Sequence, residues 1–149
     1  MNAKKRNKKL YKEHTEFIKQ PERIKDINEA NMEMLAKIDY PLFSFKYLSD
    51  ASFKSNGDLK FFKDFIYRLN KLSNISWNTI HTSQKHSFGI EKISRACIKP
   101  DIPAGITDDV NFIVFRSSGD NKAMVGFRVW NVFHVVFIEA RHNDIYDHG

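Results

Sequence analysis

Cysteine is the residue type that this chain has least of, since Cys97 is the only one among 149 residues. A single thiol excludes an intramolecular disulfide and a zinc finger, and no activating partner lies near it in the sequence, so we expect an inert thiol. The chain also lacks any apolar run approaching the roughly 18 residues that a membrane span needs. It lacks the apolar N-terminal stretch of a secretory signal as well. We therefore expect a cytoplasmic protein with no membrane partner.

The positive charge is concentrated at the N-terminus. The net charge is +6, and six of the 24 Lys and Arg residues lie within residues 1–12, which contain no acid. The 18 basic residues that remain match the 18 acidic residues, so the rest of the chain is formally neutral. A basic arm of this kind binds phosphates non-specifically or serves as a solubilising tail. We predict that residues 1–12 are dispensable for folding.

The sequence predicts a two-part organisation. Apolar residues spread among charged ones predict a helix over residues 10–38, with Pro21 as a break or a helix start. We interpret this stretch as an appended element or as a helix that binds a partner. We assign residues 1–40 to a basic arm with a helical extension, and residues 41–149 to a single α+β domain. Hydrophobic residues make up 42% of the chain, which is enough for a core of that size.

The first half of the domain is expected to contain a strand, a helix, a second short helix and a long loop, in that order. Aromatic residues at alternate positions predict a strand over 42–48. A turn at 55–58 offers an N-cap, Ser76 is expected to cap a second short helix, and 83–108 reads as a loop with a short strand around 90–93. The longer helix between these caps carries an apolar stripe that we expect to form core: Leu59, Phe62, Phe65, Ile66, Leu69 and Leu72.

The second half is expected to be three strands. Residues 111–116, 123–130 and 132–139 are rich in Val, Phe and Ile, and the tight connection at Trp130-Asn131 requires the last two strands to run antiparallel. Apolar residues on both faces of the last strand indicate a central position in the sheet. The predicted fold class is α+β, with two helices packed on one face of an antiparallel sheet.

Two polar clusters and one arginine are the candidates for chemistry. One cluster follows the last strand, from Glu139 to His148, and Arg116 closes the first of the three strands. The other cluster is the basic loop, for which we predict nucleic-acid contacts: Lys85, His86, Lys92, Arg95 and Lys99. Together they offer groups for proton transfer and cations for a phosphate, which are the parts that metal-free RNA cleavage needs.

The segment 115–121, the hairpin after it and the run 142–146 resemble the C-terminal half of the RelE/ParE toxin superfamily. Members often end in an arginine-bearing strand, a hairpin and a His-Arg-x-x-(apolar)-Tyr pattern; here Asn143 replaces that arginine. The resemblance covers roughly residues 42–148 and implies a metal-independent mRNA endoribonuclease, free or ribosome-dependent, with no cofactor and with a cognate antitoxin. By position it assigns roles to four residues, a general base, a phosphate-binding cation and two acid/base or base-stacking groups: Glu91, Arg116, His142 and Tyr146.

Other interpretations of the same residues stay open. The protein is alternatively a non-catalytic module of this fold that binds nucleic acid or protein. A catalyst needs its four residues around one site, so we predict that Arg116 and His142 face one cleft with Tyr146 at its rim. His142, Asp144 and His148 fit no strong metal template, and we predict no metal. His134 alternates with apolar neighbours, so we expect a satisfied, buried or half-buried histidine.

Overall fold

The computed structural model describes residues 34, 37–53, 59–84, 89–116 and 122–148. The chain divides into two units, Met1–Ile38 and Asp39–Gly149, and all the described strands lie in the second. The basic arm, nearly all of the expected helix over 10–38, the turn at 55–58, and Lys85 and His86 lie outside the described residues.

Five strands form one mixed sheet in the order β1-β5-β4-β3-β2. Their bounds are β1 Leu42–Ser44, β2 Glu91–Ile93, β3 Phe112–Arg116, β4 Ala123–Val129 and β5 Val132–Ile138. The last four strands pair antiparallel, whereas β1 pairs parallel with β5. The expected antiparallel sheet is therefore corrected to a mixed one, because the chain between β1 and β5 is long enough to return in the same direction.

The C-terminal hairpin follows the sequence prediction closely. Only Trp130 and Asn131 separate β4 from β5, and Trp130 adopts a left-handed φ of 57°. Arg128 supports this turn: its guanidinium donates to the Trp130 carbonyl and lies 4.0 Å from the Trp77 ring. As predicted, β5 is an interior strand, with β1 on one side and β4 on the other.

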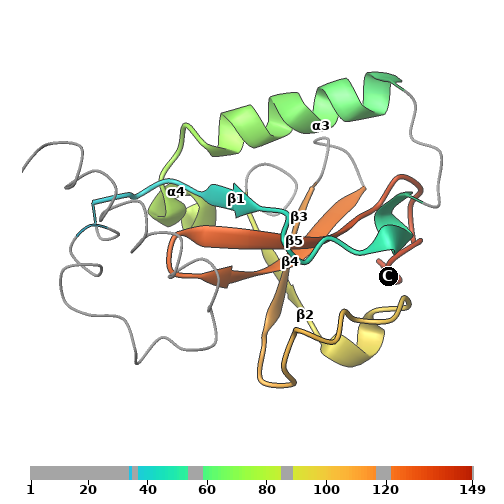
Figure 1. Cartoon of the computed structure of the whole chain (residues 1–149). Coiled ribbons are helices and arrows are strands. Elements are labelled where there is room, and N and C mark those ends of the chain that lie inside the picture. The colour runs from blue at the N-terminus through green and yellow to red at the C-terminus, as the bar shows by residue number, and fades with distance from the viewer. Residues whose placement is uncertain (1–33, 35–36, 54–58, 85–88, 117–121, 149) are drawn as a thin grey trace, which may run out of the picture. The chain divides into compact units, whose positions relative to one another are not determined.

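Two helices, α3 Leu59–Leu72 and α4 Trp77–Thr82, follow β1 in the chain (Figure 1). Ser76 caps α4 as predicted, since its Oγ accepts from the backbone N–H of Thr79 at 3.1 Å. Both helices contribute to one core cluster with the sheet, in which Phe115 meets Phe133 edge to face at 5.0 Å. The helix pair thus covers one face of the sheet, as the sequence indicated.

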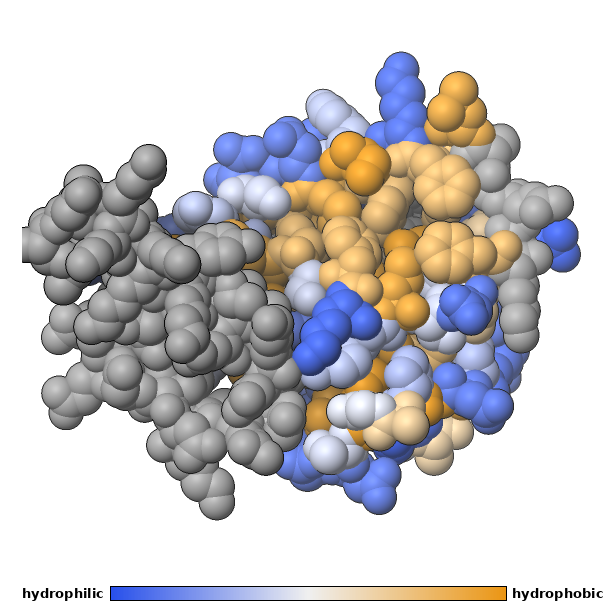
Figure 2. All heavy atoms as spheres, viewed as in Figure 1, coloured by the Kyte–Doolittle hydropathy of each residue, from blue (hydrophilic) through white to orange (hydrophobic). Residues whose placement is uncertain are grey.

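The buried face of α3 differs from the predicted stripe. Leu59, Phe62 and Ile66 are 86%, 41% and 61% exposed, and hydrophobic side chains reach the surface along α3 in Figure 2. The residues that pack on the sheet are Phe61, Phe65, Leu69 and Leu72. These positions recur every three or four residues and form a stripe of their own, turned from the predicted one. The prediction was right for three of six residues and missed Phe61.

The other face of the sheet is covered by the C-terminal segment 140–148 and the chain around η3, Arg95–Cys97. Ile145 and Tyr146 belong there to the same core cluster as Val114 and Val125. The 3-10 helix η2, Asp50–Phe53, is tied to the end of β5, because Ser52 Oγ accepts from the Ile138 N–H at 3.0 Å. This second layer brings polar residues of the C-terminus to the ends of β3 and β5.

His134, on β5, faces this second layer and is 1% exposed. Its ring stacks on Phe127 at 4.9 Å and meets Tyr47 at 5.5 Å. Burial is as expected, but Nδ1 has no hydrogen-bond partner among the described residues, so the histidine is not fully satisfied there. Desolvation, together with the charge of Lys46, lowers the pKa of His134 to about 4.

Substituting Gly126 with Ala should destabilise the protein. A bulge interrupts the β4–β5 register at Val125/Gly126, and a Cβ on Gly126 would clash with the backbone carbonyl oxygen of His134. We expect Gly126→Ala to lower the free energy of unfolding by about 1–3 kcal/mol, the usual cost of overpacking. The matched control is Gly105→Ala, whose Cβ would meet only the Tyr47 side chain, at 3.3 Å. Equal urea midpoints for the two variants would contradict the assignment.

His134 should make the protein lose stability in acid. Its folded pKa lies below the ordinary value of 6.5, so the unfolded chain binds the proton more readily and stability falls as the pH drops from 6.5 towards 4. The loss reaches about 3 kcal/mol for this one group. Urea titrations at several pH values should show a smaller loss for His134→Phe than for the wild type. Parallel losses in the two proteins would show that His134 does not titrate in this way.

Candidate functional site

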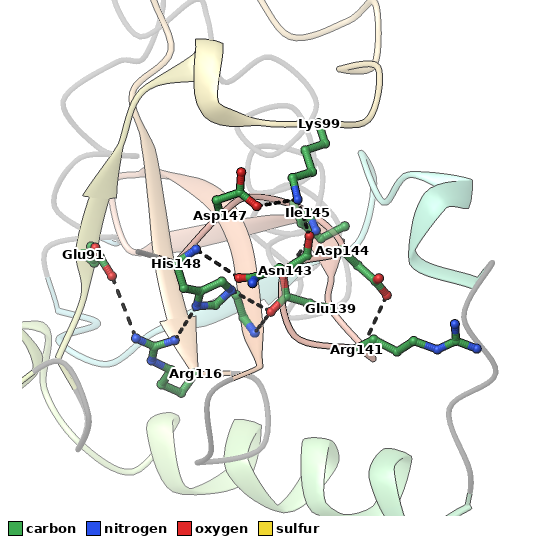
Figure 3. A network of polar contacts seen from close by, with 11 residues as sticks. Glu91, Lys99, Arg116, Glu139, Arg141, Asn143, Asp144, Ile145, Asp147 and His148 are labelled. Carbon is green, nitrogen blue, oxygen red and sulfur yellow. Dashed lines mark hydrogen bonds and ion pairs between the residues drawn. The ribbon is translucent and has the colours of Figure 1, made fainter.

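Polar side chains from three places in the chain meet at one end of the sheet (Figure 3). Glu91 lies on β2, Arg116 ends β3, and Glu139 follows β5 directly. Glu91 pairs with Val114, so it shares a face with Arg116, two residues further along β3. That face is the one covered by the C-terminal segment.

Glu139 is the most deeply buried member, with no exposed surface. Its Oε1 accepts from the Ala123 N–H at 3.3 Å and contacts His148 Nε2 at 2.7 Å. Its Oε2 accepts from the Ile145 N–H at 3.2 Å. Burial raises the pKa of Glu139 to about 7, although the backbone N–H groups oppose that shift. One carboxylate therefore links the start of β4 to two points of the C-terminal segment.

Arg116 determines which nitrogen of His148 carries the proton. The guanidinium is 5% exposed, and its Nη1 lies 3.0 Å from His148 Nδ1. An arginine only donates, so Nδ1 must accept, and a neutral His148 then carries its proton on Nε2. That proton points at Glu139, which must accept it as a carboxylate. The hydrogen bonds thus favour an ionised Glu139 despite its burial. Arg116 Nη2 also lies 3.9 Å from Glu91 Oε2.

Aromatic contacts complete the cluster around His148. Its ring stacks on Tyr146 at 4.2 Å with an interplanar angle of 18°, and it meets the His142 ring at 4.2 Å. Asn143 makes the turn between them possible, because it takes a left-handed φ of 69°, which asparagine tolerates. Its Oδ1 accepts from the His148 N–H at 3.0 Å. The turn therefore holds the rings of His142 and His148 next to each other.

Tyr146 is 3% exposed, and its hydroxyl has no hydrogen-bond partner among the described residues. Burial, reinforced by Glu91, raises its pKa to about 12. The charges of Glu91, Arg116 and Glu139 all act on this hydroxyl, so it lies within their electrostatic reach. A buried hydroxyl without a partner is costly, and it marks a place in the cluster where a further polar atom would be stabilised.

The structure connects the four predicted site residues through His148, which was not among them. Arg116 contacts His148, and His148 contacts both His142 and Tyr146. Tyr146 is buried rather than at a rim. Glu139 and His148 bound the polar cluster that the sequence singled out, but neither was among the four residues given a catalytic role. A glutamate directly after an apolar strand was a signal, because a charge that continues a buried run needs a partner.

Three ligand-type atoms come together here. One atom each from Glu139, His142 and His148 lies within 4.8 Å of the others. The sequence grouping of His142 and His148 with Asp144 is corrected, because Glu139 takes the third place. Asp144 instead accepts from the Arg141 N–H at 3.3 Å. His142 is exposed, which gives the cluster contact with solvent.

In the described part of the basic loop, Arg95 and Lys99 make contacts within the protein, whereas Lys92 lies at the surface. Arg95 donates to the carbonyls of Thr107 and Ile106 at 3.0 and 3.3 Å. Lys99 lies 2.6 Å from Asp147 and donates to the Asn143 carbonyl at 2.7 Å. Lys92 is exposed. Arg95 and Lys99 thus stabilise the layer over the sheet, and a nucleic-acid contact for this group stays a prediction.

Compared with protein-family models, curated proteins and solved structures, the chain gives no match. Among the described residues, no helix is both long enough and apolar enough to cross a membrane.

Replacing Glu139 with Ala should detach the C-terminal segment. The substitution leaves the Ala123 and Ile145 N–H groups and the His148 ring without their acceptor, and losing one partner of such a buried polar set costs about 3–5 kcal/mol. Asp144→Ala, on the exposed side of the same segment, should cost less than about 1 kcal/mol. Urea unfolding and amide hydrogen exchange of residues 140–148 would check both effects, and unchanged exchange in Glu139→Ala would overturn the anchoring role.

Proposed function

We propose that this protein is a RelE-like toxin that cleaves mRNA without a metal ion, on the ribosome or on free RNA, and that a cognate antitoxin restrains it. The observation that carries the proposal is that four residues of suitable chemistry come together in one cluster. Glu91, Arg116, His142 and Tyr146 come from distant parts of the chain, and a chain of contacts through His148 joins them. The helix pair over a sheet that ends in a three-strand antiparallel unit also fits this proposal.

The groups suit cleavage by the neighbouring 2′-hydroxyl. Glu91, whose side chain is 33% exposed, takes the 2′-OH proton as the 2′-oxygen bonds to phosphorus. Arg116 stabilises the charge of the pentavalent phosphorane. The exposed His142 gives a proton to the leaving 5′-oxygen as its bond to phosphorus breaks. The products are a 2′,3′-cyclic phosphate and a free 5′-hydroxyl. Tyr146 packs against His148 and holds the rings in place.

A second candidate is a non-catalytic module that binds nucleic acid or a protein. The depth of Arg116 and Tyr146, which are 5% and 3% exposed, favours it. The Arg116 guanidinium already contacts His148 and Glu91, so a phosphate oxygen would share it with these internal partners. In this alternative, the internal contacts of Arg116 are purely structural and the basic residues alone bind the partner.

The proposal predicts cleavage that survives chelation of metals. In the presence of EDTA, mRNA should be cut to fragments ending in a 2′,3′-cyclic or 3′-phosphate, and a translation extract tests cleavage that needs the ribosome. Arg116→Ala and His142→Ala should each lower the rate by about 100-fold or more, as loss of a transition-state cation or a proton donor does. Primer extension would locate the cuts and give the rates.

Lys60→Ala is the matched control, because Lys60 is exposed on α3, on the far side of the sheet, and pairs with Asp64 at 2.6 Å. It should cleave like the wild type. His142→Ala should melt like the wild type, since His142 is exposed. No cleavage by wild-type protein together with no growth inhibition on expression would contradict the proposal and favour the binding module.

A further inference from the structure

The cluster at the C-terminus contains two histidines and one carboxylate in an arrangement open on one side. Glu139 and His148 already touch, with His148 Nε2 2.7 Å from Glu139 Oε1. All three ligand atoms, including that of His142, lie within 4.8 Å of one another. Two ligands of one tetrahedral zinc ion lie about 3.3 Å apart when each bond is about 2.0–2.1 Å long. Small side-chain rotations therefore suffice to bring all three atoms onto one ion.

The buried Tyr146 hydroxyl is an independent indication that a group belongs at this place. It is nine-tenths buried, stacks against His148, and is without a hydrogen-bond partner among the described residues. A water bound in the fourth position of a zinc ion is a strong donor. A metal-bound water is thus a group of the kind that this hydroxyl lacks.

Arg116 works against an ion at this site. A histidine that binds metal through Nε2 carries its proton on Nδ1 and usually donates it to an acceptor. Here Arg116 faces Nδ1 at 3.0 Å and only donates. The ion therefore requires the His148 proton to move from Nε2 to Nδ1, with no net proton released, and requires the guanidinium to turn away. Glu91, 3.9 Å from Nη2, is the carboxylate that can receive it.

We propose that Glu139, His142 and His148 form a binding site for a divalent transition-metal ion of the zinc type. Arg116 weakens the site by donating to His148 Nδ1, the nitrogen that must carry the proton when Nε2 binds the ion. Mixed imidazole and carboxylate ligands suit zinc and cobalt, and a set of three leaves one position open. Metal binding can be measured without the proposed nuclease activity, but the two share His142, so an ion there would inhibit that activity by occupying this residue.

The test is direct metal binding by untagged, full-length, metal-free protein. Titration with Co²⁺ should give the visible absorption of a tetrahedral N/O site at one ion per chain, and Zn²⁺ should displace it. His142→Ala, on an exposed side chain, and Glu139→Gln should each weaken Zn²⁺ affinity by about 100-fold, since loss of a mere supporting contact already costs about 10–100-fold. Asp144→Asn, the neighbouring carboxylate, should bind like the wild type.

Arg116→Gln is the most discriminating variant, because the glutamine oxygen can accept from Nδ1–H where the arginine cannot. It should raise Zn²⁺ affinity by about 10-fold, the lower end of such supporting effects. Absence of a Co²⁺ spectrum in both the wild type and Arg116→Gln would overturn the site. So would equal affinities of the wild type and the correctly folded His142→Ala. Binding lost in Asp144→Asn but kept in Glu139→Gln would overturn the choice of ligands.

Discussion

The buried carboxylate of Glu139 is the constraint on which the second layer of the fold depends. A charged group without exposed surface is tolerated only where donors surround it. Here the donors come from β4, from the turn before Tyr146 and from the last histidine. Satisfying Glu139 therefore requires the C-terminal segment to fold back onto the sheet, which in turn covers Val114 and Val125. The need to pair the Glu139 carboxylate thus also leads the C-terminal segment to cover an apolar face of the sheet.

The same requirement determines the electrostatics of the cluster. Arg116 fixes the proton of His148 on the nitrogen that faces Glu139. The residues in contact are therefore, in order, the acid Glu91, the cation Arg116, a neutral histidine ring and the acid Glu139. Each member is paired in the resting structure. A metal ion on His148 Nε2 must therefore displace the contact with Glu139, and a phosphate at Arg116 meets a guanidinium that already contacts His148 and Glu91, so the contacts of Arg116 bear on both proposals.

Local sequence patterns predicted the helices and strands better than they predicted which residues of those elements are buried or in contact. The hairpin around Trp130 and the Ser76 cap were correct because both depend on a few adjacent residues. The face of α3 was only half right, because apolar residues occur on two sides of that helix and spacing alone does not choose between Phe61 and Phe62. The parallel pairing of β1 with β5 depends on contacts between distant residues, which no local pattern encodes. The position of Glu139 after an apolar strand indicated that it needs a partner, but not that His148 is one.

The shortness of the outer strands has a consequence for how the protein meets other chains. β1 and β2 have three residues each, whereas the strands between them have five to seven. Edge strands with free N–H and C=O groups recruit further strands and promote aggregation. After β1, the chain turns so that Ser49 and Ser52 still bond to β5, and the edge at β2 presents the exposed Lys92. The sheet therefore offers little template for added strands, whereas the outer side of α3 presents exposed Leu59, Ile66 and Tyr67 for apolar association.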